Sequence, residues 1–139
     1  MRTYEKYAQF MKICEGLAIR AAEQGNAPVG CLIIKDDKII AEAMEAGNSK
    51  QDITCHAEIE AIRIARGKLG KDLSTCEMIT THEPCVMCGY AIRFHKLSKV
   101  IYKESVPYLG SVTSDMAILA IQEVPHHWGN PPEILQFKL

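Results

Sequence analysis

The stretch "EMITTHEPCVMCGYAIRF", residues 77–94, holds the most informative junction in the chain. Its first part is apolar and ends in β-branched residues, which predicts a strand that ends at His82. Pro84 suits the first turn of a helix, because proline lacks the N–H group that a first turn leaves unbonded. Cys85 and Cys88 then lie three residues apart on that first turn, with both sulfurs facing one way. The rest of the fold is built outward from this strand, turn and helix.

The flanking sequence predicts that helices and strands alternate around this unit. Apolar residues at helical spacing indicate a first helix over 4–24, and "DD" at residues 36–37 is typical of a hairpin turn. We expect strands at 28–35, 38–43, 77–82, 99–102 and 134–137, helices also at 56–65, 85–94 and 114–122, and loops at 44–54 and 103–113. This order predicts the α/β class, as a three-layer α/β/α domain around one mixed sheet.

Length and composition are those of an ordinary globular protein. The 139 residues suit one compact domain, and the hydrophobic fraction is 47% with a net charge of −1. Nucleic-acid binding is therefore not implied by bulk charge. The longest apolar runs are too short to span a bilayer, so we expect a cytoplasmic protein without membrane contact. In such a compartment the six cysteines are expected to be core residues, metal ligands or reactive thiols instead of disulfides.

The second informative stretch is "HAEIEA", residues 56–61, at the start of another expected helix. Helix N-termini stabilise thiolates, so Cys85 and Cys88 together suit a soft cation such as Zn²⁺. Two thiolates do not complete a zinc site, and His56 is the natural third ligand. Three ligands with an open fourth position are typical of a catalytic zinc, which lowers the pKa of a bound water to about 7. Glu58 can reach that water as a general base without binding the metal.

Two other interpretations of these residues stay open at this point. "CVMC" between a strand and a helix also fits a thioredoxin-like redox site. A non-catalytic zinc-binding module would need a fourth ligand, which Cys55, Cys76 or His82 could supply. The joint pattern of the two stretches disfavours both, and Glu58 argues against the non-catalytic module because a purely structural site has no use for it.

The complete constellation is His-Ala-Glu at 56–58, then 25 residues, then Pro-Cys-Val-Met-Cys at 84–88. This is the signature of zinc deaminases of nucleobases. From "APVGCLII" (27–34) to "KVIY" (99–102) the chain resembles the cytidine deaminase-like superfamily, most of all the branch of tRNA adenosine deaminases, guanine deaminases and cytosine deaminases. The resemblance implies a CMP/dCMP-type deaminase domain over 1–139 with about five strands, a zinc cofactor, hydrolytic release of ammonia and a homodimer.

The resemblance also implies roles for individual residues. His56, Cys85 and Cys88 correspond to the zinc ligands, and Glu58 corresponds to the proton shuttle. The backbone N–H groups of Ala57 and Cys85 correspond to groups near the reacting centre. These roles agree with the chemistry expected from the residue types alone.

Four further residues are candidates for substrate contact. The resembled branch usually has an asparagine eleven residues before the ligand histidine, and here that position is Glu45, with Asn48 three residues later. An ionised carboxylate only accepts hydrogen bonds, so this departure changes what the pocket can recognise. His82 could line the pocket rim. Trp128, in "HHWGNPP" (126–132), could stack on a planar ring or anchor the C-terminal segment.

These residues predict a zinc-dependent hydrolytic deaminase of a small nucleobase, nucleoside or related amino-heterocycle, with a guanine-like purine favoured. The alternative is a tRNA-specific adenosine deaminase. Near-neutral charge and the absence of a basic tail after "EILQFKL" argue against tRNA. The basic stretch of Arg63, Arg66, Lys68 and Lys71 is interpreted as a solvated helix face in preference to an RNA contact.

Overall fold

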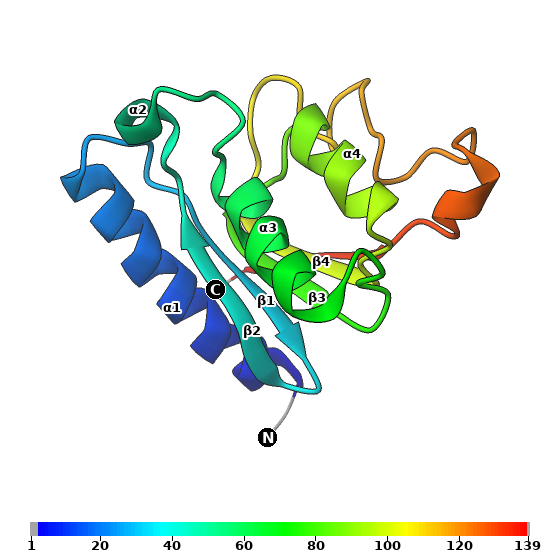
Figure 1. Cartoon of the computed structure of the whole chain (residues 1–139), viewed down its shortest axis with the longest axis horizontal. Coiled ribbons are helices and arrows are strands. Elements are labelled where there is room, and N and C mark those ends of the chain that lie inside the picture. The colour runs from blue at the N-terminus through cyan, green and yellow to red at the C-terminus, as the bar shows by residue number, and fades with distance from the viewer. Residues whose placement is uncertain (1–2, 139) are drawn as a thin grey trace.

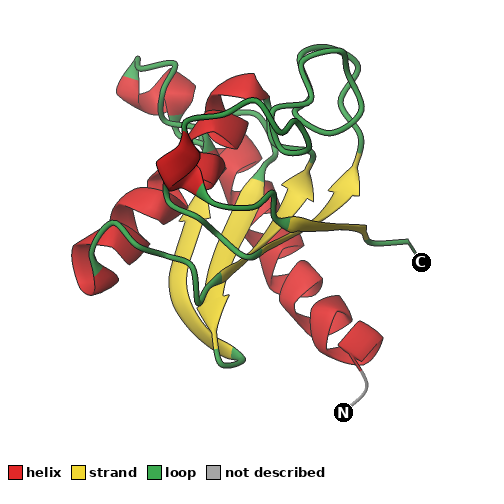
Figure 2. Cartoon of the chain, turned by 90° about the vertical axis from the view of Figure 1, so that its right-hand side faces the viewer, coloured by secondary structure: helices red, strands yellow, loops and turns green. Residues whose placement is uncertain are grey.

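The computed structural model describes residues 3–138 and shows a five-stranded mixed sheet between helices (Figures 1 and 2). The helices are α1 (Thr3–Glu23), α2 (Gly47–Lys50), α3 (Ala57–Leu69), α4 (Val86–Phe94) and the 3₁₀ turn η1 (His126–Trp128); the strands are β1 (Gly30–Lys35), β2 (Lys38–Met44), β3 (Glu77–His82), β4 (Lys99–Glu104) and β5 (Glu133–Gln136). The strand order is β2-β1-β3-β4-β5. Strand β1 is antiparallel to β2 and β3, whereas β3, β4 and β5 are parallel. The predicted α/β class and layer order are confirmed.

The sheet separates two apolar cores. On one face α1 packs through residues such as Tyr7 and Met11 against Leu32 and Ile79. On the other face α3 and α4 cover the sheet (Figure 1). The side chains that α3, α4 and the sheet turn toward each other form the second core. Burial on both faces explains why β1 is an apolar run without alternation.

Most predicted elements are present, with two differences. The loop expected over 44–54 contains the one-turn helix α2. The helix expected over 114–122 is absent from the described chain, which forms successive turns there. The guanidinium of Arg93 accounts for this, because its Nη1 donates to the carbonyls of Ile118 at 2.8 Å and Ile121 at 2.9 Å. The buried cation holds those carbonyls in an irregular path, and this tertiary contact overrides the local helical pattern.

The helices α3 and α4, which cover the second face of the sheet, position the candidate site. Residue His56 is the N-cap of α3 and Cys85 is the N-cap of α4, and both have extended backbone conformations. Strand β3 runs into Cys85 through Glu83 and Pro84, so the carboxyl end of a central strand and two helix N-termini meet at one edge of the sheet. Among the described residues no helix is long and apolar enough to cross a membrane.

A candidate metal centre at two helix N-termini

Three ligand atoms converge where α3 and α4 begin. The Nδ1 atom of His56 lies 3.5 Å from the Sγ atoms of both Cys85 and Cys88, and the two sulfurs are 3.7 Å apart. A tetrahedral zinc ion with Zn–S bonds of about 2.3 Å and a Zn–N bond of about 2.0 Å requires S–S and N–S separations of about 3.8 and about 3.5 Å. The donor set therefore fits zinc in both type and spacing. Within residues 3–138 no other group of three such side chains is close enough to hold a metal.

The protonation of these three residues reflects crowded negative charge. A hydrogen bond shared with Cys88 lowers the pKa of the Cys85 thiol to about 4. The partner sulfur of Cys85 and burial raise the pKa of the Cys88 thiol well above its usual value. The Cys85 sulfur also raises the pKa of His56 to about 9. The two sulfurs and the imidazole therefore share protons, and a divalent cation that binds to them releases those protons.

Glu58 lies beside this centre and is almost fully buried, with 4% of its surface exposed. The hydroxyl of Thr80 donates to its Oε2 at 2.7 Å, while its Oε1 lies 3.7 Å from the Cys88 sulfur. One carboxylate oxygen is thus held by the sheet and the other faces the metal position. Burial raises the pKa of Glu58, which suits a carboxyl that must both take and release a proton near neutral pH.

A cavity of about 210 Å³ opens in front of the centre. The side chains that line it are Ala27, Val29, Glu45, His56, Glu58, His82, Glu83, Cys85 and Val106. Burial lowers the pKa of His82, so its imidazole is neutral at physiological pH. The structure therefore brings His56, Cys85, the predicted base Glu58, Glu45 and His82 into one pocket, while the third predicted ligand, Cys88, is fully buried next to Cys85.

The wall formed by Glu83 is a fixed part of this cavity. Its carboxylate accepts hydrogen bonds from the backbone N–H groups of Val106, Val112 and Thr113 and from the Thr113 hydroxyl, at 2.7–3.2 Å. A side chain at Gly110 would collide with this carboxylate, so a larger residue there would displace Glu83 from its hydrogen bonds. Glu83 thus fastens the loop after β4 to the start of α4.

Two predicted substrate residues lie elsewhere. Asn48 donates from Nδ2 to the carbonyl of Gly25 at 2.9 Å and does not line the cavity. Trp128 is 3% exposed and packs edge-on against Tyr90, with ring centroids 4.7 Å apart. The contacts of Trp128 favour its second interpretation, an anchor for the C-terminal segment.

The backbone groups predicted near the reacting centre have suitable positions. Ala57 is the first residue of α3 and Cys85 caps α4, so their N–H groups lie at helix N-termini, where donors have no partner within the helix. Sequence reasoning missed Thr80 and Val106. The alternation of "EMITTH" could have placed Thr80 on the Glu58 side of β3, whereas nothing in the loop sequence indicates Val106.

Comparison with known proteins agrees with this geometry. The family described as cytidine and deoxycytidylate deaminase zinc-binding region matches residues 4–104. The chain is 40% identical over 111 residues to a tRNA-specific adenosine deaminase of Aquifex aeolicus. The matched region covers 79% of this chain and 74% of that protein. A solved structure from a study of A-to-I editing by tRNA:A34 deaminases has a TM-score of 0.84 at 29% identity, covering 93% of this chain and 97% of its own. Guanine deaminase from Bacillus subtilis has a TM-score of 0.69 at 36% identity, covering 76% of this chain and 66% of its own.

Proposed function

The chain belongs to the cytidine and deoxycytidylate deaminase zinc-binding family, whose members hydrolyse C–N bonds, and from this premise we propose that it converts adenosine to inosine in tRNA. The observation that carries the proposal is the 40% identity to a tRNA-specific adenosine deaminase across most of both chains. The relatives reverse the order expected from charge, in which a free guanine-like purine ranked above tRNA. Zinc is the cofactor of this family, and His56, Cys85 and Cys88 are the residues that would hold it here.

Each residue of the pocket has a separate role in the proposed hydrolysis. When bound, zinc supplies a Lewis acid that makes water nucleophilic near neutral pH. Glu58 takes a proton from the attacking water and passes protons to the ring nitrogen and to the departing amine, so that adenosine and water give inosine and ammonia. Thr80 holds Oε2 of Glu58 at 2.7 Å and leaves Oε1 free for these transfers. The neutral His82 and the walls of the cavity orient the ring.

The proposal is tested with zinc-loaded protein and unmodified tRNA transcripts. We expect an adenosine of the anticodon loop to be converted to inosine, and we expect no inosine when Glu58 is replaced by glutamine. Free adenosine, guanine and cytosine are assayed in parallel by ammonia release. Turnover of a free base with no inosine in any transcript would contradict the proposal.

One observation favours a second function, deamination of a free guanine-type base. Glu45 lines the cavity, and its Oε2 accepts the backbone N–H of Gly47 at 2.9 Å. Within the described chain no other hydrogen bond reaches this side chain, so one carboxylate oxygen is left for the substrate. A carboxylate requires a donor, and the N–H edge of guanine supplies one whereas the ring nitrogens of adenine do not.

A further inference from the structure

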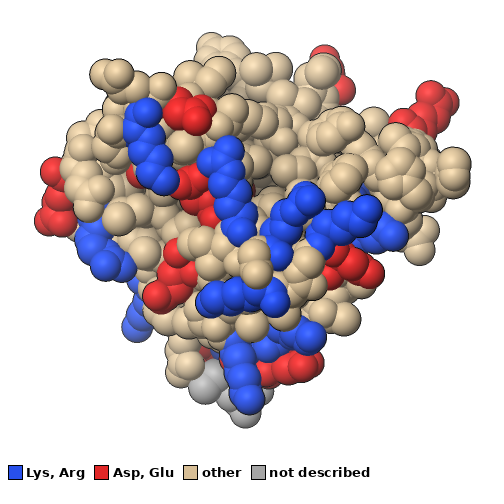
Figure 3. All heavy atoms as spheres, in the orientation of Figure 1, with Lys and Arg blue, Asp and Glu red and all other residues tan. Residues whose placement is uncertain are grey.

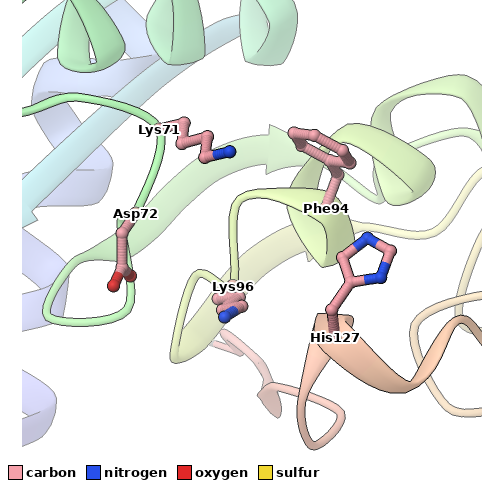
Figure 4. Close-up of a pocket in the computed structure, with 5 residues that line it drawn as sticks. All are labelled: Lys71, Asp72, Phe94, Lys96 and His127. Atoms are coloured by element: carbon pink, nitrogen blue, oxygen red, sulfur yellow. The ribbon is translucent and has the colours of Figure 1, made fainter.

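A second cavity, of about 200 Å³, lies at the other end of α4 from the metal centre. It is lined by Lys71, Asp72, Phe94, Lys96 and His127 (Figure 4). These residues come from three separate segments: the α3–β3 loop, the C-terminal end of α4 with the turn after it, and η1. The nine residues of α4 place this cavity about 13 Å along the helix from Cys85. No step of the proposed deamination uses it.

The two lysines of this cavity are free to bind an anion. Neither Lys71 nor Lys96 forms an ion pair with another described residue. The carboxylate of Asp72 accepts the backbone N–H of Ser74 at 3.0 Å, and Figure 4 shows it turned away from the ammonium group of Lys71. The carboxylate of Asp72 therefore bonds within its own turn, and the two lysines give the cavity a net positive charge.

The helix ends next to the cavity do not need these lysines. The carbonyl of Arg66, in the last turn of α3, accepts the N–H of Gly70 at 2.8 Å. The carbonyl of Ala91, in the last turn of α4, accepts the N–H of His95 at 3.0 Å. Among the described residues the lysine ammonium groups that donate hydrogen bonds are those of Lys50, Lys68 and Lys103, so those of Lys71 and Lys96 remain available for a ligand.

An aromatic wall stands opposite Lys71. The rings of Phe94 and His127 meet edge to face, with centroids 6.4 Å apart and an interplanar angle of 87°. Figure 4 shows Lys71 extending from its loop toward this side of the cavity. Cations beside an aromatic face are the combination that binds one nucleotide of a single strand, through its phosphate and its base.

Further cations connect this cavity with the metal centre. Arg66 lies against His95, with Nη1 3.2 Å from Nε2. One turn earlier in α3, Arg63 forms an ion pair with Glu60 at 2.5 Å and donates to the Thr54 hydroxyl at 3.3 Å, two residues before the metal ligand His56. Figure 3 shows several Lys and Arg side chains over the middle of this face of the molecule, with Asp and Glu side chains among them. Arg66, Lys71 and Lys96 form no ion pair with a described residue. Three such cations extend beyond the size of a single phosphate, which favours a polynucleotide over a free nucleotide.

We propose that the cavity binds one nucleotide of a single-stranded RNA segment while another part of the same RNA enters the metal pocket. Its phosphate contacts Lys71 and Lys96, and its base packs against Phe94. The ligand class rests on the proposed tRNA function, but the contact is a binding event that is measured without deamination.

The test compares charge removal in the cavity with charge removal elsewhere. The double variant Lys71→Gln/Lys96→Gln and the single variant Phe94→Leu are matched by Lys12→Gln/Lys38→Gln, whose lysines are exposed on α1 and at the β1–β2 hairpin. Affinity for unmodified tRNA is measured by filter binding over a range of salt concentrations. We expect the double variant to bind about tenfold more weakly or worse and to lose about 0.7 from the salt slope, the value for one phosphate of a single strand. Phe94→Leu should weaken binding about fivefold or more through lost stacking, and the control should match wild type.

Three outcomes would overturn the proposal. Wild-type affinity and salt slope in the double variant would remove the lysines from the RNA contact. AMP that binds as tightly as tRNA and competes with it would make the cavity a mononucleotide site. A change in sedimentation mass without RNA would make it a contact between protein copies. If the variants lose RNA binding while wild type deaminates no tRNA, the binding inference stands and the proposed function fails. If wild type deaminates tRNA and the double variant binds and deaminates it equally well, the proposed function stands and the binding inference fails.

Discussion

The carboxylate of Glu58 combines burial with a single fixed oxygen, and this arrangement predicts the effect of replacing it. Glutamine keeps the size of the side chain and its bond from Thr80 but cannot carry the proton. We expect Glu58→Gln to retain about one zinc per chain while turnover falls about 10²- to 10⁴-fold. Metal analysis and steady-state kinetics on one preparation check this. Glu42→Gln, exposed on β2, is the control; loss of zinc from Glu58→Gln would show that Glu58 serves the metal instead.

Glu45 carries the prediction about which ring the pocket prefers. A buried acceptor without a donor costs about 1–3 kcal/mol, so a carboxylate on the cavity wall favours guanine-type edges and opposes bare ring nitrogens. We expect Glu45→Gln to lower kcat/KM for guanine and to raise it for adenosine, each by about fivefold or more. Asn48→Ala is the matched control, because Asn48 is tied to Gly25 outside the cavity. If wild type and Glu45→Gln rank the substrates by kcat/KM in the same order, Glu45 does not determine which ring the pocket prefers.

At the scale of residues, the sequence is informative where the chemistry is local. His56 with Glu58, and Cys85 with Cys88, are each close in sequence, so their spacing alone indicates a metal and its base. The choice between Glu45 and Asn48 depends on how the segment before α3 folds back on the α1–β1 loop. Such a contact joins residues about twenty positions apart, and sequence spacing cannot reveal it.

At the scale of elements, Glu83 fixes the loop between β4 and η1, and its titration makes that loop pH-dependent. Burial would raise the pKa of Glu83, but the donors of Thr113, Val112 and Val106 outweigh it and lower the pKa. A carboxyl whose pKa is lower in the folded state stabilises the fold above its usual pKa of about 4.3, and this contribution is lost as the pH falls through the folded value.

We therefore expect Glu83→Gln to lower the free energy of unfolding by about 1.5–3 kcal/mol at pH 7. The deficit should shrink as the pH falls below about 4, where wild-type Glu83 also becomes neutral. Denaturant unfolding at several pH values measures it, with the exposed Glu104→Gln as the control. A deficit that is independent of pH would mean that the carboxylate charge does not hold the loop.

The elements that the sequence predicts best are those with a strong local pattern. Helix α1 and strands β1 to β4 follow from apolar spacing and from turn residues. The segment 114–122 has helical spacing too, yet Arg93 captures its carbonyls and a side chain at Gly89 would collide with Ile118. The close approach of α4 to this segment decides its path, and that approach is a property of the packed fold.

At the scale of the whole molecule, net charge is a poor guide to the partner. The chain carries −1 overall, yet Arg63, Arg66, Lys71 and Lys96 lie on one side of α3 or near its C-terminal end. Glu60 pairs with Arg63 and Asp72 lines the same cavity, so the local excess of positive charge comes from Arg66, Lys71 and Lys96. Only their distribution over the surface bears on RNA, and that distribution becomes visible once the elements are placed in space.

The exposed apolar side chains near the metal end lead to a prediction about assembly. Ile53 is 85% exposed three residues before His56, and Tyr108 and Leu109 are 83% and 56% exposed in the loop that Glu83 holds beside the cavity. Large exposed apolar side chains in the segments next to a site are typical of a protein interface. We expect a homodimer in sedimentation equilibrium, and Ile53→Ser/Tyr108→Ser should weaken it about tenfold or more, because each buried large apolar side chain contributes about 1.5–3 kcal/mol. The control Ile19→Ser alters another exposed apolar side chain, on α1. A monomer mass at every concentration would exclude the dimer, and these residues would then face solvent or RNA alone.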